Sequence, residues 1–217
     1  MQSQKFSLML DSVRRLMRGG ATARALNVLK KSRPADVAMV LQALSDLDRK
    51  SVFSALARSE TALAATSLSE LSQQEAFELL KTLTPEGIAQ VLQELPSDDA
   101  AQFIAEFPQE LREELLDLMK VEASTEVQEL LSFAENTAGR IMTPDVFALK
   151  EDLTVSEAIS AIQRDSSDIE LVFYLYIVDD RNHLVGVSSL RQLLLVPPTT
   201  PLKKFMNGDV ISVATDT

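Results

Sequence analysis

Residues 71–118 read LSQQEAFELLKT, LTPEGIAQVLQE, LPSDDAAQFIAE and FPQELREELLDL, which are four units of twelve residues each. Every unit opens with an apolar residue followed by Ser, Thr or Pro, at Leu71-Ser72, Leu83-Thr84, Leu95-Pro96 and Phe107-Pro108. Every unit also closes with an apolar pair, at Leu79-Leu80, Val91-Leu92, Phe103-Ile104 and Leu115-Leu116. A Ser or Thr side chain caps free helix amides, proline fits the first turn, and the acids that follow suit the helix dipole. The repeat therefore predicts one short helix per unit.

Helices of about two turns are not stable alone in water, so these units must stack. Stacking buries the apolar pairs against neighbouring units and predicts a compact right-angled or superhelical array. Less regular helices are expected before the repeat, around 34–44 and 47–56.

The composition restricts the classes of function. The 217 residues are 46% hydrophobic, which is enough for one large domain or two ordinary ones. The net charge of -11 opposes attraction to nucleic-acid phosphates and anionic membrane surfaces and favours cations as partners. The absence of cysteine excludes disulfides, thiolate catalysis and zinc fingers, and His183 is the sole histidine. Because no nucleophile-base pattern or phosphate loop is present either, an enzyme is not expected.

Charge is uneven along the chain. The N-terminal stretch is basic, with Lys5, Arg14, Arg15, Arg18, Arg24, Lys30, Lys31 and Arg33 against Asp11. Residues 86–135 hold thirteen acids against Arg112 and Lys120. Most of these acids, including Glu110, Glu113 and Glu114, are interpreted as a solvated helical surface. Together they still form a surface that attracts cations.

The pattern changes after residue 135, where the turn-rich stretch 136–144 ends the helical repeat. A strand is predicted at 146–149, and then a helix that starts at Thr154 with Glu157 completing a capping box. The run 171–178 is far shorter than the roughly 20 residues that span a bilayer and is predicted as a strand from 172. A strand at 184–188 and a helix at 190–195 follow. We therefore divide the chain into an acidic helical-repeat domain, 1–134, and a second domain, 135–217.

The second domain resembles a CBS domain in the residues 142–144 (MTP), 176–180 (YIVDD) and 184–188 (LVGVS). Together with the acidic repeat, the residues 136–139 (NTAG), 174–176 (YLY), 189–191 (SLR) and 197–198 (PP) are similar to the cytosolic region of MgtE-type magnesium transporters. The resemblance implies an α plus α/β chain, with a superhelical array of short helices followed by a CBS domain. It also implies that a second CBS motif begins near 205 and is truncated at Thr217.

This family implies a function. The chain is expected to be the magnesium-sensing regulatory region on the cytoplasmic side of the membrane, itself soluble and part of an integral membrane protein. It would gate a transmembrane pore domain, which the chain lacks, through magnesium-dependent closure of the N-domain and CBS interface. Homodimerisation through the CBS region is expected, and nucleic acid is not an expected partner. The alternative is a stand-alone CBS-containing adaptor that binds an adenine nucleotide and a protein partner.

The resemblance also suggests metal ligands. Asp98 and Asp99 fall at the family's N-domain acidic pair, and Asp216 falls at a metal-facing position of the second CBS motif. Magnesium takes oxygen ligands and uses one or two carboxylates, so no dense motif is required. The alternative for Asp98 and Asp99 is that adjacent acids at a helix start only complement the helix dipole. Gln102 and Thr66 stand where relatives carry acids.

The resemblance suggests a nucleotide site as well, for ATP or another adenine nucleotide. Its candidates are Tyr174 as a stacking partner, together with Ser189, Arg191 and Gln192. Gln192 occupies the position where CBS domains carry a ribose-binding aspartate, and an amide bonds a hydroxyl more weakly than a carboxylate does. The alternative for Tyr174 is that it packs in the core as an aromatic residue of an apolar strand.

Overall fold

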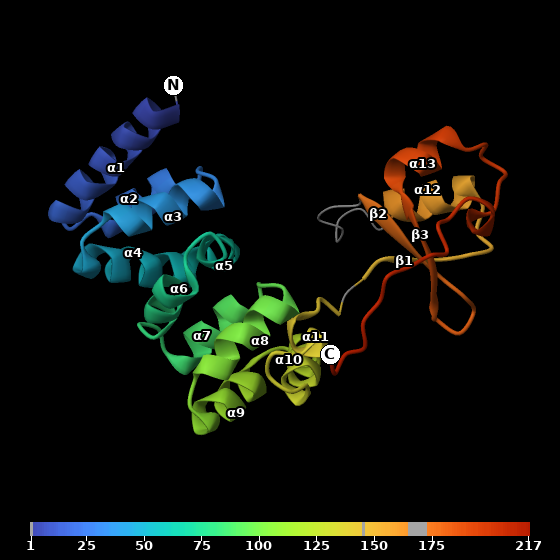
Figure 1. Ribbon diagram of the computed structural model, residues 1–217. Coiled ribbons are helices and arrows are strands. Elements are labelled where there is room, and N and C mark those ends of the chain that lie inside the picture. The colour runs from blue at the N-terminus through green and yellow to red at the C-terminus, as the bar shows by residue number, and fades with distance from the viewer. Residues whose placement is uncertain (1, 145, 165–172) are drawn as a thin grey trace. The chain divides into compact units, whose positions relative to one another are not determined.

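The computed structural model describes residues 2–144, 146–164 and 173–217 (Figure 1). The chain divides into two compact units, one of Met1–Thr143 with Thr215–Thr217 and the other of Pro144–Ala214. It therefore crosses from one unit to the other twice. This division differs from the sequence-based one at 134/135, because the helix Ala138–Ile141 packs against helices of the first unit.

The first unit is helical throughout its regular structure. Its helices are α1 (Gln2–Arg18), α2 (Thr22–Leu29), α3 (Pro34–Ala43), α4 (Asp46–Ser59), α5 (Thr61–Leu68), α6 (Gln73–Leu80), α7 (Pro85–Leu92), α8 (Ser97–Glu106), α9 (Gln109–Leu118), α10 (Val121–Ser132) and α11 (Ala138–Ile141). The four predicted repeat helices are α6 to α9, one for each unit of twelve residues.

The repeat helices begin as their sequence predicts. Ser72 and Glu75 form a reciprocal capping box at α6, and the Thr84 hydroxyl accepts a hydrogen bond from the Gly87 amide at α7. Pro96 and Pro108 take the N-cap positions of α8 and α9, one residue earlier than the first turn where proline was expected. Each helix therefore starts at the repeat's Ser, Thr or Pro.

Helices pack mainly against the next helix but one. Thus α3, α5, α7 and α9 form one row, and α2, α4 and α6 form a second (Figure 1). Helix α8 packs against α10 in the same way. The closing apolar pairs supply the core between the rows, since Leu80, Leu92, Ile104 and Leu115 are fully buried. This alternation is the superhelical array that the repeat predicts.

The second unit is a small mixed sheet with helices. It contains β1 (Ala148–Lys150), α12 (Val155–Arg164), β2 (Tyr174–Val178), β3 (Leu184–Ser189), α13 (Leu190–Leu195) and a 3-10 turn at Leu202–Lys204. The strand order is β1-β2-β3, with β1 and β2 parallel and β2 and β3 antiparallel. The predicted order of strand, helix, strand, strand and helix is confirmed. The capping box at the start of α12 is present, because Thr154 and Glu157 exchange hydrogen bonds.

Among the described residues of this unit, seven buried side chains form a core: Leu149, Val155, Ala158, Leu175, Ile177, Leu193 and Leu202. The first strand is Ala148–Lys150 rather than 146–149, and the third extends one residue beyond its prediction, to Ser189. Residue 172, predicted to begin the second strand, lies outside the described residues. The stretch 208–214 has no regular secondary structure, and Ile211 and Val213 are largely exposed. Among the described residues, no helix combines the length and apolar character needed to cross a membrane.

Candidate functional site

The acidic candidates Asp98 and Asp99 lie in the first turn of α8, where the free amides of the helix favour negative charge. Both residues are half-buried. The N-cap residue is Pro96, which has no side-chain oxygen. No side-chain cap therefore competes with the two carboxylates for the free amides of the helix. This position is compatible both with the dipole interpretation and with metal binding. Asp98 and Asp99 differ, however, in their hydrogen-bond partners.

Asp98 has one satisfied and one unsatisfied oxygen. Its Oδ2 accepts a hydrogen bond from Thr143 Oγ1 at 3.1 Å, while its Oδ1 is buried and has no hydrogen-bond partner among the described residues. A buried carboxylate oxygen without a partner is costly, and a hard cation or an ordered water would satisfy it. Asp99 differs, because its Oδ2 accepts from Ser69 Oγ at 3.3 Å.

Asp216 reaches the first unit through a short returning segment. The amide of Ala138 donates to the Thr217 carbonyl and that of Gly139 donates to the Thr215 carbonyl, each at 2.8 Å. Gly139 allows this approach, since a Cβ atom there would lie 2.6 Å from Phe133 Cδ1 and 2.9 Å from the Thr215 oxygen. The start of α11 therefore holds the segment that carries Asp216.

Both candidate ligands belong to the first unit, each beside a point where the chain leaves or re-enters that unit. Thr143, the partner of Asp98, is the last residue before the first crossing, and Asp216 is the second residue after the return. In the part of the chain that the structure describes, no group of three or more His, Asp or Glu side chains is arranged to hold a metal ion. An ion here would be held by few carboxylates and by water, as magnesium allows.

Arg140 on α11 is a cation of this region. Its Nη2 donates to the carbonyl of Ala101 on α8 at 3.5 Å, and its Nη1 is buried without a partner among the described residues. Burial lowers the pKa of Arg140 below its ordinary value, and the charge of Glu135 opposes that shift. Arg140 and Thr143 both fall within or next to the sequence motif that marked the family, but their contacts with α8 had no signal in the sequence.

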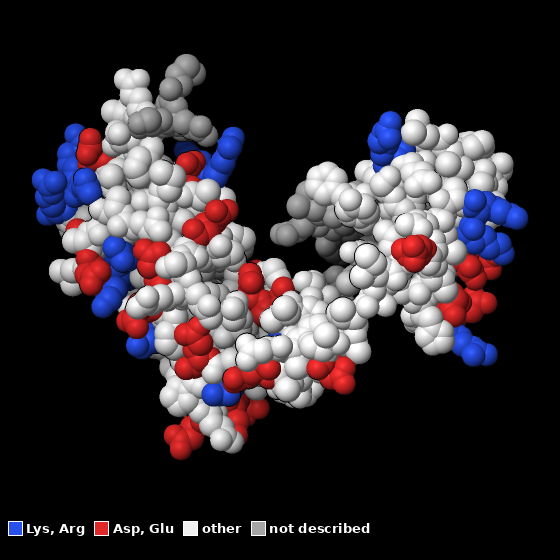
Figure 2. Space-filling model, in the orientation of Figure 1, with Lys and Arg blue, Asp and Glu red and all other residues white. Residues whose placement is uncertain are grey.

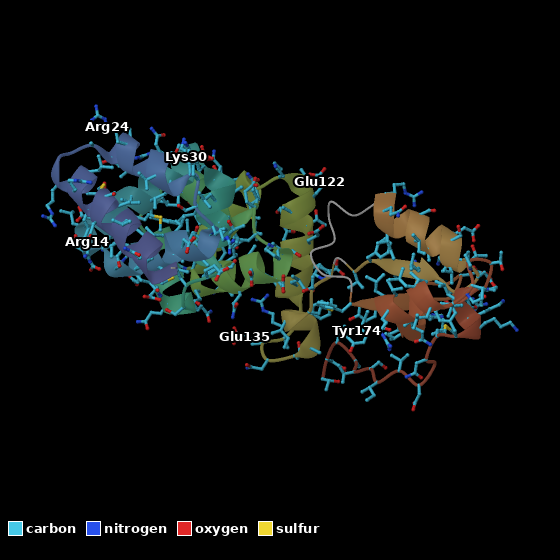
Figure 3. The ribbon with its side chains drawn as sticks, turned by 90° about the horizontal axis from the view of Figure 1, so that it is seen from above. Arg14, Arg24, Lys30, Glu122, Glu135 and Tyr174 are labelled. Atoms are coloured by element: carbon cyan, nitrogen blue, oxygen red, sulfur yellow. The ribbon has the colours of Figure 1, made fainter. Side chains whose placement is uncertain are left out.

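Tyr174 begins β2 and is 65% exposed, so the alternative interpretation, that it packs in the core, is wrong (Figure 3). The alternation of β2 explains this, because Leu175 and Ile177 point into the core and leave Tyr174 and Tyr176 on the outer side. Tyr174 is paired in register with Ser189, the last residue of β3. The sheet thus brings these two nucleotide candidates together.

The other nucleotide candidates are at the start of α13. Ser189 is its N-cap, and its hydroxyl accepts a hydrogen bond from the Gln192 amide at 3.1 Å. The Gln192 side chain donates to the Phe205 carbonyl at 2.9 Å, so it braces the chain after α13. Arg191 is exposed. The Ser189 hydroxyl and the Gln192 amide group therefore already have structural partners, whereas Tyr174 and Arg191 are accessible.

Comparison with known proteins identifies both units. Residues 32–136 match the family model of the MgtE intracellular N domain, and residues 138–198 match that of the CBS domain. The crystal structure of the cytosolic domain of the Mg2+ channel MgtE in complex with ATP superposes with a TM-score of 0.81 at 34% identity, covering 96% of this chain and 84% of that one. The chain belongs to the MgtE family. The soluble part of a magnesium transporter also matches, with a TM-score of 0.78, 25% identity and coverage of 98% and 81%.

Whole MgtE transporters are much longer than the matched segment. The magnesium transporter MgtE of Thermus thermophilus is 39% identical over 103 residues, which are 48% of this chain and 23% of that protein. The MgtE of Enterococcus faecalis is 38% identical over 92 residues, 42% of this chain and 20% of its own length. The chain thus corresponds to the N-domain and CBS region of MgtE proteins and spans less than a quarter of the curated relatives it matches.

Proposed function

We propose that this chain senses magnesium on the cytoplasmic side of the membrane and biases the gate of an attached transmembrane pore domain. The observation that carries the proposal is that Asp98 is hydrogen-bonded to Thr143, the last residue before the chain leaves the first unit, while Asp216 lies on the segment that returns to it. A charge change at the crossings acts where the chain passes from the N domain to the CBS unit.

The residues fit a hard cation. Asp98 offers a buried oxygen without a partner among the described residues, and Asp99 and Asp216 add carboxylates at the helix start and on the returning segment. Without a cation the like charges repel each other, and bound magnesium supplies the positive charge that offsets them. Thr143 positions Asp98, and the start of α11 positions the segment with Asp216. Binding would favour closure of the N domain on the CBS unit, and the pore would respond to that shift in population.

Small-angle scattering and limited proteolysis during a magnesium titration, with calcium as the control ion, test the proposal. We expect compaction and protection in the wild type. Asp98→Asn should require at least about tenfold more magnesium for the same compaction, since even changes to residues around a metal ligand cost about that factor in metal affinity. Asp117→Asn is the matched control, because Asp117 is exposed and lies on α9, away from the crossings. A profile that magnesium leaves unchanged would contradict the sensor.

We also propose that the CBS unit binds an adenine nucleotide. The structurally similar MgtE domain was crystallised with ATP, and in this chain the exposed ring of Tyr174 lies beside Ser189 and the exposed Arg191 follows on α13. Stacking on an accessible ring contributes about 1 to 3 kcal/mol, so Tyr174→Ala should weaken ATP binding about tenfold in calorimetry. Tyr176→Ala, on the same side of β2, is the control. An equal loss of ATP affinity in both variants, or no ATP binding by the wild type, would contradict this site.

Association of two chains through the CBS unit is the third part of the proposal. Leu194 and Leu195 on α13 are 66% and 71% exposed, and adjacent exposed leucines favour an apolar partner. A second copy supplies the same surface in a symmetric pair. Sedimentation velocity should show a dimer that Leu195→Asp dissociates, whereas a wild type that is monomeric at every concentration would exclude it.

A further inference from the structure

The magnesium proposal leaves the N-terminal charge of this chain unexplained. Residues 1–33 carry eight of the 21 Lys and Arg residues but one of the 32 Asp and Glu residues, which gives this segment a formal charge of +7 within a chain of -11. Most of the segment also precedes residues 32–136, which match the MgtE N-domain model. The basic charge is thus concentrated in the N-terminal segment.

Five exposed cations form what we call the basic end of the N-terminal unit: Arg15, Arg18, Arg24, Lys31 and Arg33. None of the five has an ion pair among the described residues. Two other cations of the segment have structural contacts, since Lys30 pairs with Glu60 at 2.8 Å and Arg14 donates to the Ala43 carbonyl at 2.6 Å.

The basic end is compact. Lys and Arg atoms gather over the α1 and α2 end of the unit in Figure 2, and Figure 3 places Arg14, Arg24 and Lys30 at that end. Helix α2 has 8 residues, so the turns at its two ends are about 12 Å apart. The cations of α1 and those of the α2–α3 turn therefore lie within the area of a few lipid headgroups.

We propose that the basic end docks on the anionic phospholipid headgroups of a bilayer. The outward face of α1 combines Arg15 and Arg18 with Leu8, which is 65% exposed and lies two turns before Arg15. A basic face with an exposed leucine suits a bilayer interface, where the leucine enters the apolar boundary and the cations contact headgroups. The one aromatic residue of the segment, Phe6, is partly buried against the core and is unsuited to base stacking.

The acidic remainder of the chain does not cancel this attraction. Electrostatic interactions through water are screened over about 8 Å at physiological salt, so a bilayer in contact with the basic end responds mainly to the charges nearest to it. The acidic repeat surface is repelled from the same bilayer. The two effects together orient the chain, with the basic end toward the lipid. The inference rests on the proposed function only in taking the chain to work beside a membrane.

Co-sedimentation with vesicles tests the inference, with the whole chain in EDTA so that magnesium plays no part. Vesicles of phosphatidylcholine mixed with phosphatidylglycerol should bind the wild type, and vesicles of phosphatidylcholine alone should not. A variant with Arg15→Gln, Arg18→Gln and Arg24→Gln should bind about a hundredfold more weakly, because each cation near an anionic surface contributes about a factor of five. Salt at about 0.5 M should release the wild type.

Two further variants separate charge from folding. Replacing the same three arginines by lysine keeps the charge and should preserve binding. The control variant removes three exposed cations elsewhere, Lys50, Lys120 and Lys204, as glutamine. Equal loss in the control variant, equal binding to neutral vesicles, or no binding of the wild type would each overturn the inference.

A second copy of the chain is the competing partner, because its acidic surface also complements the basic end. Sedimentation velocity at the same ionic strength detects it: a self-associated species that the arginine-to-glutamine variant abolishes would replace the membrane as the partner. Asp98→Asn should retain vesicle binding, so failure of the membrane inference and failure of the magnesium sensor give different results.

Discussion

Replacing Gly139 by alanine should detach the segment that carries Asp216. The added Cβ atom would lie 2.6 Å from Cδ1 and 2.7 Å from Cγ of Phe133, and 2.9 Å from the Thr215 carbonyl oxygen. Phe133 is half-buried and can turn aside, but the Thr215 oxygen is backbone and moves only with its segment. The low-energy response is therefore release of residues 215–217 from α11.

The magnitude follows from the contacts that are lost. Release breaks the hydrogen bonds from the Ala138 and Gly139 amides, which together are worth about 2 kcal/mol. Moving Phe133 off its rotamer costs about a further 1 kcal/mol. The higher helix propensity of alanine relative to glycine offsets about 1 kcal/mol of the total cost. The net loss of about 2 kcal/mol corresponds to a roughly thirtyfold change in the docked fraction.

Hydrogen exchange measured by mass spectrometry gives the test. Exchange of the amides at positions 138 and 139 should become about thirtyfold faster in Gly139→Ala, and magnesium-induced compaction should weaken with it. Gly87→Ala is the matched control, since its Cβ would meet Leu83 at an acceptable 3.4 Å within α7. That substitution should stabilise the chain by up to about 1 kcal/mol. Unchanged protection at positions 138 and 139 would refute the argument from Gly139.

Three stability predictions concern caps and core. Ser72→Ala should lower the unfolding free energy by about 1 kcal/mol, because it removes a side-chain cap. The hydrogen bond from the Ser72 hydroxyl is the main cause that lowers the pKa of Glu75. The stability that the ionised Glu75 contributes is therefore present above pH 4.5 and is lost as the pH falls through the lower pKa of the folded state. Thermal unfolding across that range should show a weaker pH dependence in Ser72→Ala, and an unaltered dependence would contradict the capping role. Leu80→Ala, at a fully buried position, should cost about 2 to 5 kcal/mol in urea unfolding, whereas Leu118→Ala, at a 42% exposed position, should cost under about 1 kcal/mol. Thr154→Ala should destabilise the CBS unit by about 1 kcal/mol and leave hydrogen exchange in the helical unit unchanged.

Local rules in the sequence predicted most of the architecture. The repeat of twelve residues carries its own caps and apolar pairs, so helices α6 to α9 and their buried faces follow from residue spacing alone. The same holds for the order of elements in the CBS unit, where strand alternation and the Thr154 capping box are local patterns. Strand ends were predicted less well, because β1 begins where pairing with β2 begins, and that pairing joins residues far apart in the chain.

The candidate sites depended on the tertiary structure. Asp98 and Asp216 are more than a hundred residues apart, and family resemblance suggested them without showing that both belong to the same compact unit. The surroundings of Asp98 arise only when α11 packs on α8, and the position of Asp216 requires the space left by Gly139. The outward direction of Tyr174 likewise follows from which side of β2 covers the core. The elements and the uneven charge follow from neighbouring residues, whereas contacts between distant segments form only when the core packs.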